Sequence, residues 1–174
     1  MFSEKIHSAM NDQIQRELES AYIYLSMAAY FDSNNLPGFA RWMKMQFQEE
    51  QAHAFKFYDF VYDRGGQVML QALGQPPVEF ESPLDAFEKT LAHERKITGH
   101  IDDLYALAVE EKDYPSQILL QWFVSEQVEE EKTAGDIVDM LKRIGDSYQA
   151  LIMLDRELGQ RLPPVETQTD AETE

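Results

Sequence analysis

The chain has 174 residues, of which 44% are apolar, and this size and composition suit one globular domain with a full hydrophobic core. Its 32 acidic and 15 basic residues give a formal net charge of −17, which argues against nucleic acid as a partner because a polyanion would be repelled. The chain has no cysteine, which excludes disulfides, thiol nucleophiles, iron–sulfur clusters and cysteine-type zinc sites.

The first two predicted elements are long amphipathic helices. Apolar residues recur every three or four positions between clusters of glycine and proline, which is the period of a helix with one buried face. The first helix is expected over about 3–32 and ends at the sequence SNNLPGF. The second is expected from Pro37, which suits the first turn of a helix, to Arg64, just before a pair of glycines. The short connection between them predicts an antiparallel hairpin.

A long connection rich in glycine and proline, residues 65–82, follows the second helix. When extended it reaches roughly 60 Å, whereas a helix of about 28 residues is roughly 42 Å long. It can therefore cross the whole bundle and leave the second and third helices parallel. The third helix is expected from Ser82 to about Lys112, with Asp85 placed as in a capping box. After the break KDYP, a fourth helix is expected to about Gly145, antiparallel to the third.

The remaining sequence predicts a short fifth helix and a polar tail. The helix is expected over 147–158 and stops at Gly159. Residues 161–174 are acidic and nearly free of apolar side chains, which predicts a disordered tail behind a single domain of residues 1–160. No apolar run is long enough for a membrane span, and the first residues, MFSEKIHSAM, lack the layout of a signal peptide. We therefore expect a cytoplasmic, all-α protein without a membrane partner.

The buried stripe of each long helix is interrupted near its midpoint by side chains that can bind a metal. Helical periodicity places these polar residues on the same face as the apolar ones. They are Glu17 and Tyr24 in the first helix, Glu50 and His53 in the second, Glu94 in the third, and Gln127 and Glu130 in the fourth. In an antiparallel bundle the midpoints of the four helices meet at nearly one level.

A single glutamate on such a stripe is most often a boundary residue whose carboxylate reaches water. Four at one level are harder to explain in this way, because each uncompensated buried carboxylate costs roughly several kcal/mol. Like charges would also force at least one of them to be protonated. Two divalent cations would balance four carboxylates. Oxygen ligands with one imidazole suit iron or manganese better than copper, although zinc could also bind.

These residues resemble the pattern of ferritin-like di-iron bundles, in which one glutamate from each of two helices joins Glu-x-x-His motifs from the other two. Glu17 and Glu94 match the single glutamates, and the sequence EQAH at 50–53 matches one motif. The fourth helix departs from the pattern, because QVEE at 127–130 has glutamine where the second motif would begin and lacks its histidine. With this departure, residues 1–160 resemble the non-haem ferritins of bacteria and archaea. The stretches that carry the likeness are RELESAYIYLSMAAYFD, QEEQAHAFKFYDF, LQWFVSEQVEEEK and LDRELGQ.

The resemblance implies a ferritin-like four-helix bundle with one long crossover connection, a short C-terminal fifth helix and an intrasubunit ferroxidase centre. The first iron would be bound by Glu17, Glu50 and His53, with Glu50 bridging. The second iron would be bound by Glu94, Gln127 and Glu130. A neighbouring third iron site would use Glu49, Glu126 and Glu129, with Glu130 shared. Without the resemblance, the acidic run 129–131 also fits a solvated face, an interpretation that we keep for Glu131.

Several other residues receive an interpretation at this stage. Tyr24 suits a core tyrosine bonded to a carboxylate, and the resemblance adds electron donation during dioxygen reduction, with Trp122 assisting. Haem is not expected, because Gln51 stands where bacterioferritins have the haem-ligating methionine. The remaining histidines are expected at the surface, and they are His7, His93 and His100.

The function implied by the resemblance is iron storage. Fe(II) would be oxidised by dioxygen or hydrogen peroxide and deposited as a ferric mineral inside a hollow homo-oligomer of 24 subunits. One alternative is a di-iron peroxidase or oxygenase of the rubrerythrin type, which would want a second Glu-x-x-His motif and often a cysteine-rich module. A second is a DNA-protecting mini-ferritin, which would want basic termini and ligands split between subunits, and a third is a purely structural bundle.

Overall fold

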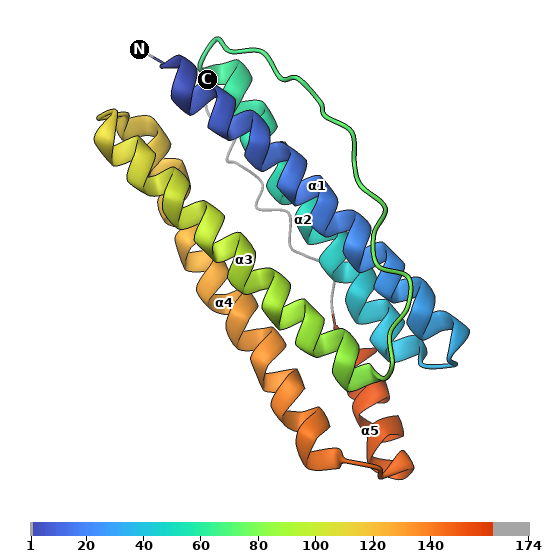
Figure 1. The fold of residues 1–174 in the computed structure, drawn as a ribbon. Coiled ribbons are helices and arrows are strands. Elements are labelled where there is room, and N and C mark those ends of the chain that lie inside the picture. Colours follow the sequence, from blue (N-terminus) through green and yellow to red (C-terminus); the bar gives the residue numbers. More distant parts are fainter. Residues whose placement is uncertain (1, 162–174) are drawn as a thin grey trace, which may run out of the picture.

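The structure is a computed structural model that describes residues 2–161, and this part of the chain contains five α-helices and no strand. The helices are α1 (Glu4–Ser33), α2 (Pro37–Asp63), α3 (Pro83–Glu110), α4 (Tyr114–Ile144) and α5 (Tyr148–Leu158). The α1–α2 and α3–α4 hairpins lie side by side, and α5 packs at one end of the bundle (Figure 1). This confirms the all-α prediction. None of the helices in the described range is long and apolar enough to cross a membrane.

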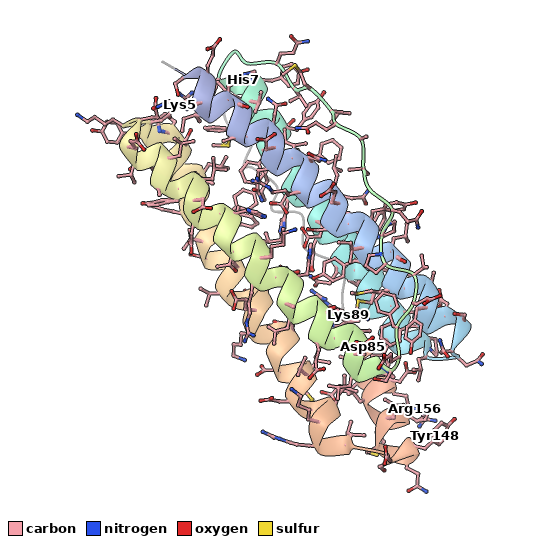
Figure 2. All side chains as sticks on the ribbon, in the orientation of Figure 1. Lys5, His7, Asp85, Lys89, Tyr148 and Arg156 are labelled. Carbon is pink, nitrogen blue, oxygen red and sulfur yellow. The ribbon has the colours of Figure 1, made fainter. Side chains whose placement is uncertain are left out.

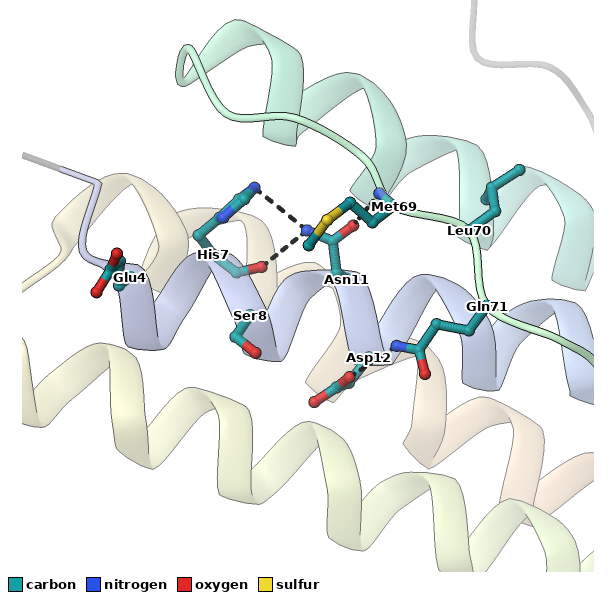
Figure 3. A pocket seen from close by; sticks show the side chains of 8 residues that line it. All are labelled: Glu4, His7, Ser8, Asn11, Asp12, Met69, Leu70 and Gln71. Atoms are coloured by element: carbon teal, nitrogen blue, oxygen red, sulfur yellow. Dashed lines mark hydrogen bonds between the residues drawn. The ribbon is translucent and has the colours of Figure 1, made fainter.

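The connection from α2 to α3 runs the length of the bundle beside α1, so that α2 and α3 point the same way, as predicted (Figure 1). Its first part is held by side chains of α1. Asn11 accepts a hydrogen bond from the Met69 amide at 2.7 Å, and its amide nitrogen lies 3.2 Å from the Gln67 carbonyl. Figure 3 shows Asn11 and His7 facing this connection above a shallow pocket. These bonds satisfy backbone groups that an extended segment cannot satisfy internally.

Side chains cap three of the four long helices from within their own sequence. The Ser82 hydroxyl accepts from the Asp85 amide at 3.1 Å, as the capping box predicts. The Asp85 carboxylate accepts from the Glu81 amide at 3.0 Å, one residue before the amide that a standard box would use. It also lies 2.7 Å from the Lys89 ammonium, and Figure 2 labels both side chains at the start of α3. The other two such caps are Ser3 for α1 and Asp113 for α4.

Helix α2 has no side-chain cap of its own, and α5 supplies one. The Asp155 carboxylate on α5 accepts from the Gly38 amide at 2.8 Å and the Phe39 amide at 3.0 Å. A carboxylate at this end of a helix also complements the helix dipole. The close approach requires glycine, because a Cβ atom added to Gly38 would lie 1.6 Å from the Asp155 carbonyl oxygen. This contact fixes α5 against the start of α2.

The hydrophobic core consists of two clusters separated along the bundle axis. One lies toward α5 and includes the stacked rings of Phe31 and Phe39, whose centroids are 5.0 Å apart. The other lies toward the opposite end and includes Phe57 and Phe123, stacked at 4.1 Å. Each large side chain buried in these clusters contributes roughly 1.5–3 kcal/mol. The two clusters frame the midpoint of the bundle, where buried polar side chains gather.

Candidate metal centre

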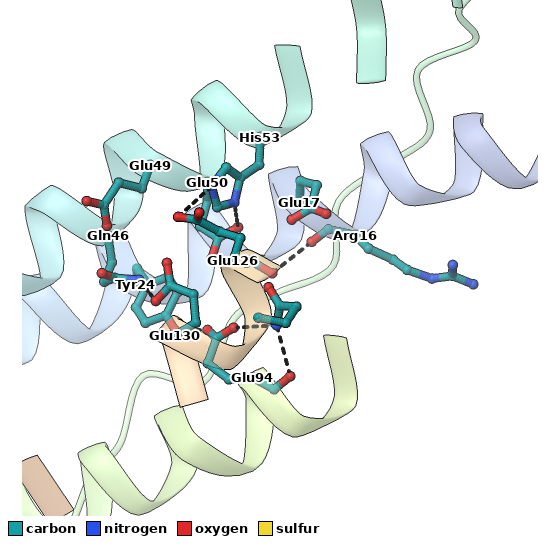
Figure 4. A network of polar contacts seen from close by, with 12 residues as sticks. Arg16, Glu17, Tyr24, Gln46, Glu49, Glu50, His53, Glu94, Glu126 and Glu130 are labelled. Atoms are coloured by element: carbon teal, nitrogen blue, oxygen red, sulfur yellow. Dashed lines mark hydrogen bonds and ion pairs between the residues drawn. The ribbon is translucent and has the colours of Figure 1, made fainter. Parts of the chain in front are cut away.

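The polar residues predicted on the four buried stripes all lie inside the bundle. Their exposed fractions range from 0% for Tyr24 and 1% for Glu17 and Glu94 to 6% for Glu130. Figure 4 shows the labelled glutamates, His53 and Tyr24 converging from the four long helices. The other members of this group are Glu50, His53 and Gln127. The burial that the helical period predicts for each of these side chains is therefore confirmed.

Glu17, Glu50 and His53 form the tightest group. Each offers one ligand atom, and these atoms lie within 4.8 Å of one another. The His53 Nδ1 is 3.4 Å from a Glu50 carboxyl oxygen. Burial lowers the pKa of His53 to about 4, so the imidazole is neutral at pH 7 and keeps a lone pair for a metal. Because His53 is neutral, its contact with Glu50 is not an ion pair.

The carboxyl groups of this cluster hold protons more tightly than glutamate does in water. Burial raises the pKa of Glu17 from 4.5 to about 7. It raises the pKa of Glu50 well above its ordinary value, and the charges of Glu94, Glu17 and Glu130 raise it further. A cation placed among these groups would reverse both effects, because it favours the charged carboxylates. The site is therefore built so that binding of a cation displaces protons.

A second group surrounds Glu94 and Glu130. The Tyr24 hydroxyl donates to one oxygen of Glu94, and the Gln127 amide nitrogen lies 3.2 Å from the other. Glu130 accepts from the Gln46 amide nitrogen at 2.9 Å. Burial is the first cause that raises the pKa of Glu94 and of Glu130. Unlike the first group, these residues do not bring three carboxylate or histidine ligand atoms within 4.8 Å of one another.

Two buried glutamines take part in the centre although the sequence interpretation gave them no role. Gln46 and Gln13 are both 0% exposed. Gln13 donates to Glu17 at 2.8 Å and accepts from the Arg16 guanidinium at 3.1 Å. Each glutamine thus orients one carboxylate of the centre. Gln46 was detectable, because it lies on the predicted stripe of the second helix as a polar residue one turn before Glu50.

The predicted third group lies at the edge of this centre. Glu49 and Glu126 are half-buried, and Glu129 is exposed. A Glu126 oxygen lies 3.9 Å from His53 Nε2, which places Glu126 beside the first group. Glu49 contacts the Arg161 guanidinium at 2.6 Å. After burial, the charges of Glu126 and Glu129 are among the effects that raise the pKa of Glu49. These carboxylates also do not form a group as tight as Glu17, Glu50 and His53 within the described range.

Four surface assignments need correction. His93 is half-buried, with Nε2 2.7 Å from the Ser20 hydroxyl and its ring edge-on to Tyr24, because α3 packs against α1 on that flank. His7 is half-buried because the crossover connection covers it, and its Nε2 lies 2.7 Å from the Gln67 carbonyl. Glu131 is half-buried and accepts from Thr98 at 2.6 Å, so it is not a freely solvated carboxylate. His100, which is also only partly exposed, is a milder case of the same error.

The remaining assignments fall partly outside the described residues. Trp122 is 39% exposed, and its ring lies edge-on to His53 at 5.4 Å with the Lys56 ammonium 4.5 Å from its centroid. Of the predicted tail 161–174, only Arg161 is described, and residues 162–174 lie outside the described range. Arg161 is packed against the bundle through Glu49 and Trp42.

Comparison with known proteins gives consistent matches over the whole bundle. The model of the ferritin-like domain family matches residues 7–144. A bacterial non-heme ferritin of Bacteroides fragilis is 44% identical over 161 residues, which are 92% of this chain and 100% of that protein. A bacterial non-heme ferritin of Staphylococcus epidermidis is 40% identical over 92% of this chain and 97% of that protein.

Among solved structures, an open pore ferritin from the archaeon Archaeoglobus fulgidus superposes with a TM-score of 0.92 and 51% sequence identity. The match covers 93% of this chain and 100% of that chain. The span matched by the family model, 7–144, includes every candidate ligand from Glu17 to Glu130.

Proposed function

The chain belongs to the ferritin family, and from this membership we propose that it is an iron-storage protein that oxidises Fe(II) at the centre described above. The observation that carries the proposal is the buried polar layer at mid-bundle, where Glu17, Glu50 and His53 offer three ligand atoms within 4.8 Å. Buried carboxylates of this kind are destabilising unless a cation or a proton neutralises them. A role in binding a cationic substrate gives a reason for their presence.

Two Fe(II) ions are the substrate in this proposal. The first would be bound by Glu17, Glu50 and His53, and Glu50 would bridge to the second. The second would be bound by Glu94, Gln127 and Glu130. The carboxyl groups would lose their protons as the ions bind, because ligands must be deprotonated. His53 requires no such step, since its pKa of about 4 leaves it neutral at pH 7.

The chemistry of the ligands suits oxidation followed by release. Anionic oxygen ligands favour Fe(III) over Fe(II), because they stabilise the higher charge more strongly. Oxidation of two Fe(II) ions supplies two electrons, which with two protons reduce one dioxygen to hydrogen peroxide. Gln127 is a neutral ligand where an anionic one would be expected, and it holds the second iron less firmly. This suits a substrate that moves on into a mineral. Reduction of dioxygen to two waters would take four electrons and four protons, and Tyr24, bonded to Glu94, would supply one of these electrons beside three Fe(II) ions.

Storage needs a container, and we propose that 24 copies of the chain form a hollow shell. The outer faces of α4 and α5 carry large exposed apolar side chains, which contacts between subunits would remove from water. Examples are Ile118 and Met153, each 71% exposed, and Val128, which is 70% exposed. The likeness to a ferritin described as open-pored supports a hollow assembly, because a pore presupposes a wall around a space.

The test is aerobic addition of Fe(II) to the assembled protein while Fe(III) formation is followed by absorbance. We expect rapid oxidation in the wild type, with a loss of at least about tenfold in Glu50→Ala and His53→Ala, because each removes a ligand. Glu110→Ala, which removes an exposed carboxylate from α3, is the matched control and should leave the rate unchanged. Equal rates in all four proteins would refute the ferroxidase proposal. Particles that never retain more iron than the ligand sites can bind would refute storage.

A further inference from the structure

Arg161, which follows α5 at the end of the described residues, brings a positive charge to the candidate third site. The Arg161 Nη2 lies 2.6 Å from a Glu49 carboxylate oxygen, and the two side chains are only 22% and 18% exposed. The guanidinium also lies over the ring of Trp42, 4.6 Å from its centroid. The Arg161 carbonyl accepts from the Arg41 guanidinium at 3.2 Å. Arg161 is thus fixed by three independent contacts with α2.

The position of Arg161 follows from the docking of α5. Asp155 caps the start of α2 through the amides of Gly38 and Phe39, and Leu158 is buried in the hydrophobic cluster near α5. Helix α5 is therefore anchored on α2, the helix that carries Glu49. The chain leaves α5 at Gly159 and places the next arginine against the middle part of α2. The docking of α5 therefore positions the Arg161 guanidinium beside the Glu49 carboxylate.

Arg161 is distinct from the other cations near the centre. Among the ion pairs of the described residues, the pair with a candidate ligand that involves an arginine or a lysine is Arg161 with Glu49. The other nearby cations have different partners: the Lys56 ammonium lies over the Trp122 ring, and the Arg16 guanidinium donates to Gln13. The Arg161 Nη1 is buried without a hydrogen-bond acceptor in the described part of the chain. Its pairing with Glu49 therefore uses one nitrogen, and it lacks the second bond that makes an arginine–carboxylate pair strongest.

We propose that Arg161 is the built-in counter-cation of the third site, and that its guanidinium holds Glu49 until a metal cation competes for the same carboxylate. The proposal rests on the proposed function, which supplies the third site. Two cations that require one carboxylate weaken each other's binding by the same factor. Arg161 therefore lowers the affinity of the third site and makes it fill after the two iron positions. A metal ion that takes Glu49 also releases the guanidinium from Trp42.

The first experiment is a calorimetric titration of the assembled, metal-free protein with Zn²⁺, a redox-inert cation that binds oxygen and nitrogen ligands. We expect two tight sites and one weaker site per chain in the wild type. Arg161→Gln should tighten the weak site on the order of tenfold and leave the tight sites unchanged. Arg161→Lys keeps the charge and should stay near the wild type. Glu49→Gln should abolish the weak site.

The matched control is Arg156→Gln, which removes an exposed arginine from α5 (Figure 2) and changes the net charge equally. If Arg156→Gln tightens the weak site as much as Arg161→Gln, the effect is one of net charge and the proposal is wrong. A weak site that loosens in Arg161→Gln would make Arg161 a support for Glu49 and would also overturn it. If neither the wild type nor Arg161→Gln binds a third Zn²⁺, the third site itself is refuted, while two tight sites would leave the ferroxidase proposal standing.

The second experiment follows the release of Arg161 directly. The two tryptophans of the chain are Trp42 and Trp122, so that Trp122→Phe leaves Trp42 as the single fluorescent reporter beneath the guanidinium. Filling of the third site with Zn²⁺ should change the Trp42 emission in this background, and the change should disappear when Arg161→Gln is added. An emission that stays constant while the third Zn²⁺ binds would show that Arg161 remains in place, which would contradict the proposed competition.

Discussion

At the scale of single residues, the centre is defined by groups whose pKa values are shifted by burial toward the neutral form. His53 is neutral with a pKa of about 4, and Glu17 has a pKa of about 7. Their common cause is removal from water, which disfavours the charged form of either group. Gln13 partly offsets this for Glu17 by donating a hydrogen bond. The candidate ligands thus depend on neighbours that are not themselves candidate ligands.

The raised pKa of Glu17 predicts that the contribution of this residue to the stability of the metal-free protein is lost as the pH rises. The folded chain binds this proton more tightly than the unfolded chain, whose pKa is near 4.5. The stabilisation is therefore complete below about pH 4.5 and is lost as the pH passes through about 7. We expect the free energy of unfolding of the wild type minus that of Glu17→Gln, both measured by chemical denaturation, to fall by roughly 2 kcal/mol between about pH 5.5 and about pH 7.5. The difference is the quantity to measure, because His53 and His93, whose pKa values are lowered to about 4, add stability over the same pH range in both proteins.

Glu17→Gln provides the control for this prediction, because an amide has no proton to lose. The dependence on pH that remains in this variant combines the raised pKa values of Glu50, Glu94 and Glu130 with the lowered pKa values of His53 and His93. A difference between the two proteins that stays constant or grows over this pH range would contradict the assignment of a buried, protonated Glu17.

At the scale of elements, the docking of α5 on α2 decides both the end of the bundle and the position of Arg161. Gly38→Ala should disrupt it, because the added Cβ would lie 1.6 Å from the Asp155 carbonyl oxygen, and backbone must move to relieve the overlap. We expect a loss of about 2 kcal/mol or more in the free energy of unfolding. Thermal and chemical denaturation at a fixed subunit concentration measure this loss.

Gly99→Ala is the matched control for Gly38→Ala, since Gly99 lies within α3 and nothing stands within 4 Å of the Cβ position. Alanine is a better helix former than glycine, so this variant should gain roughly 0.5–1 kcal/mol. If the two variants change stability by the same amount in the same direction, the close contact between α2 and α5 does not constrain the fold as described.

The elements themselves could be predicted because each depends on local signals. The period of apolar residues gives four long helices, and Ser82 and Gly145 mark a start and an end. The same period places Glu94 and Glu130 on the apolar face of their helices and so predicts their burial, which the residues adjacent to them in the sequence would not indicate. Contacts between elements were not predictable in this way. The partner of Gln46 is on α4 and the partner of Glu49 follows α5, so neither contact has a signature in local periodicity.

At the scale of the whole molecule, two hydrophobic clusters hold together a bundle that contains a buried polar layer. The clusters lie on either side of the centre, so that the four helices are held together above and below it. This arrangement allows the layer to be destabilising in the metal-free protein without unfolding the bundle. Functional sites are commonly places where stability is lower than an apolar sequence would give.

Replacing a central carboxyl group with an apolar one should therefore stabilise the metal-free protein and abolish its activity. Glu50 is the best position, because it is 2% exposed and the charges of Glu94, Glu17 and Glu130 all act against its ionisation. Methionine has a similar volume and a similar helix propensity. We expect Glu50→Met to raise the free energy of unfolding by roughly 1–4 kcal/mol at about pH 7.5, while Fe(II) oxidation falls to the level without protein. Glu110→Met on the exposed face of α3 should change neither. A less stable Glu50→Met would mean that the hydrogen bonds of the polar layer contribute more to the fold than its buried charge costs.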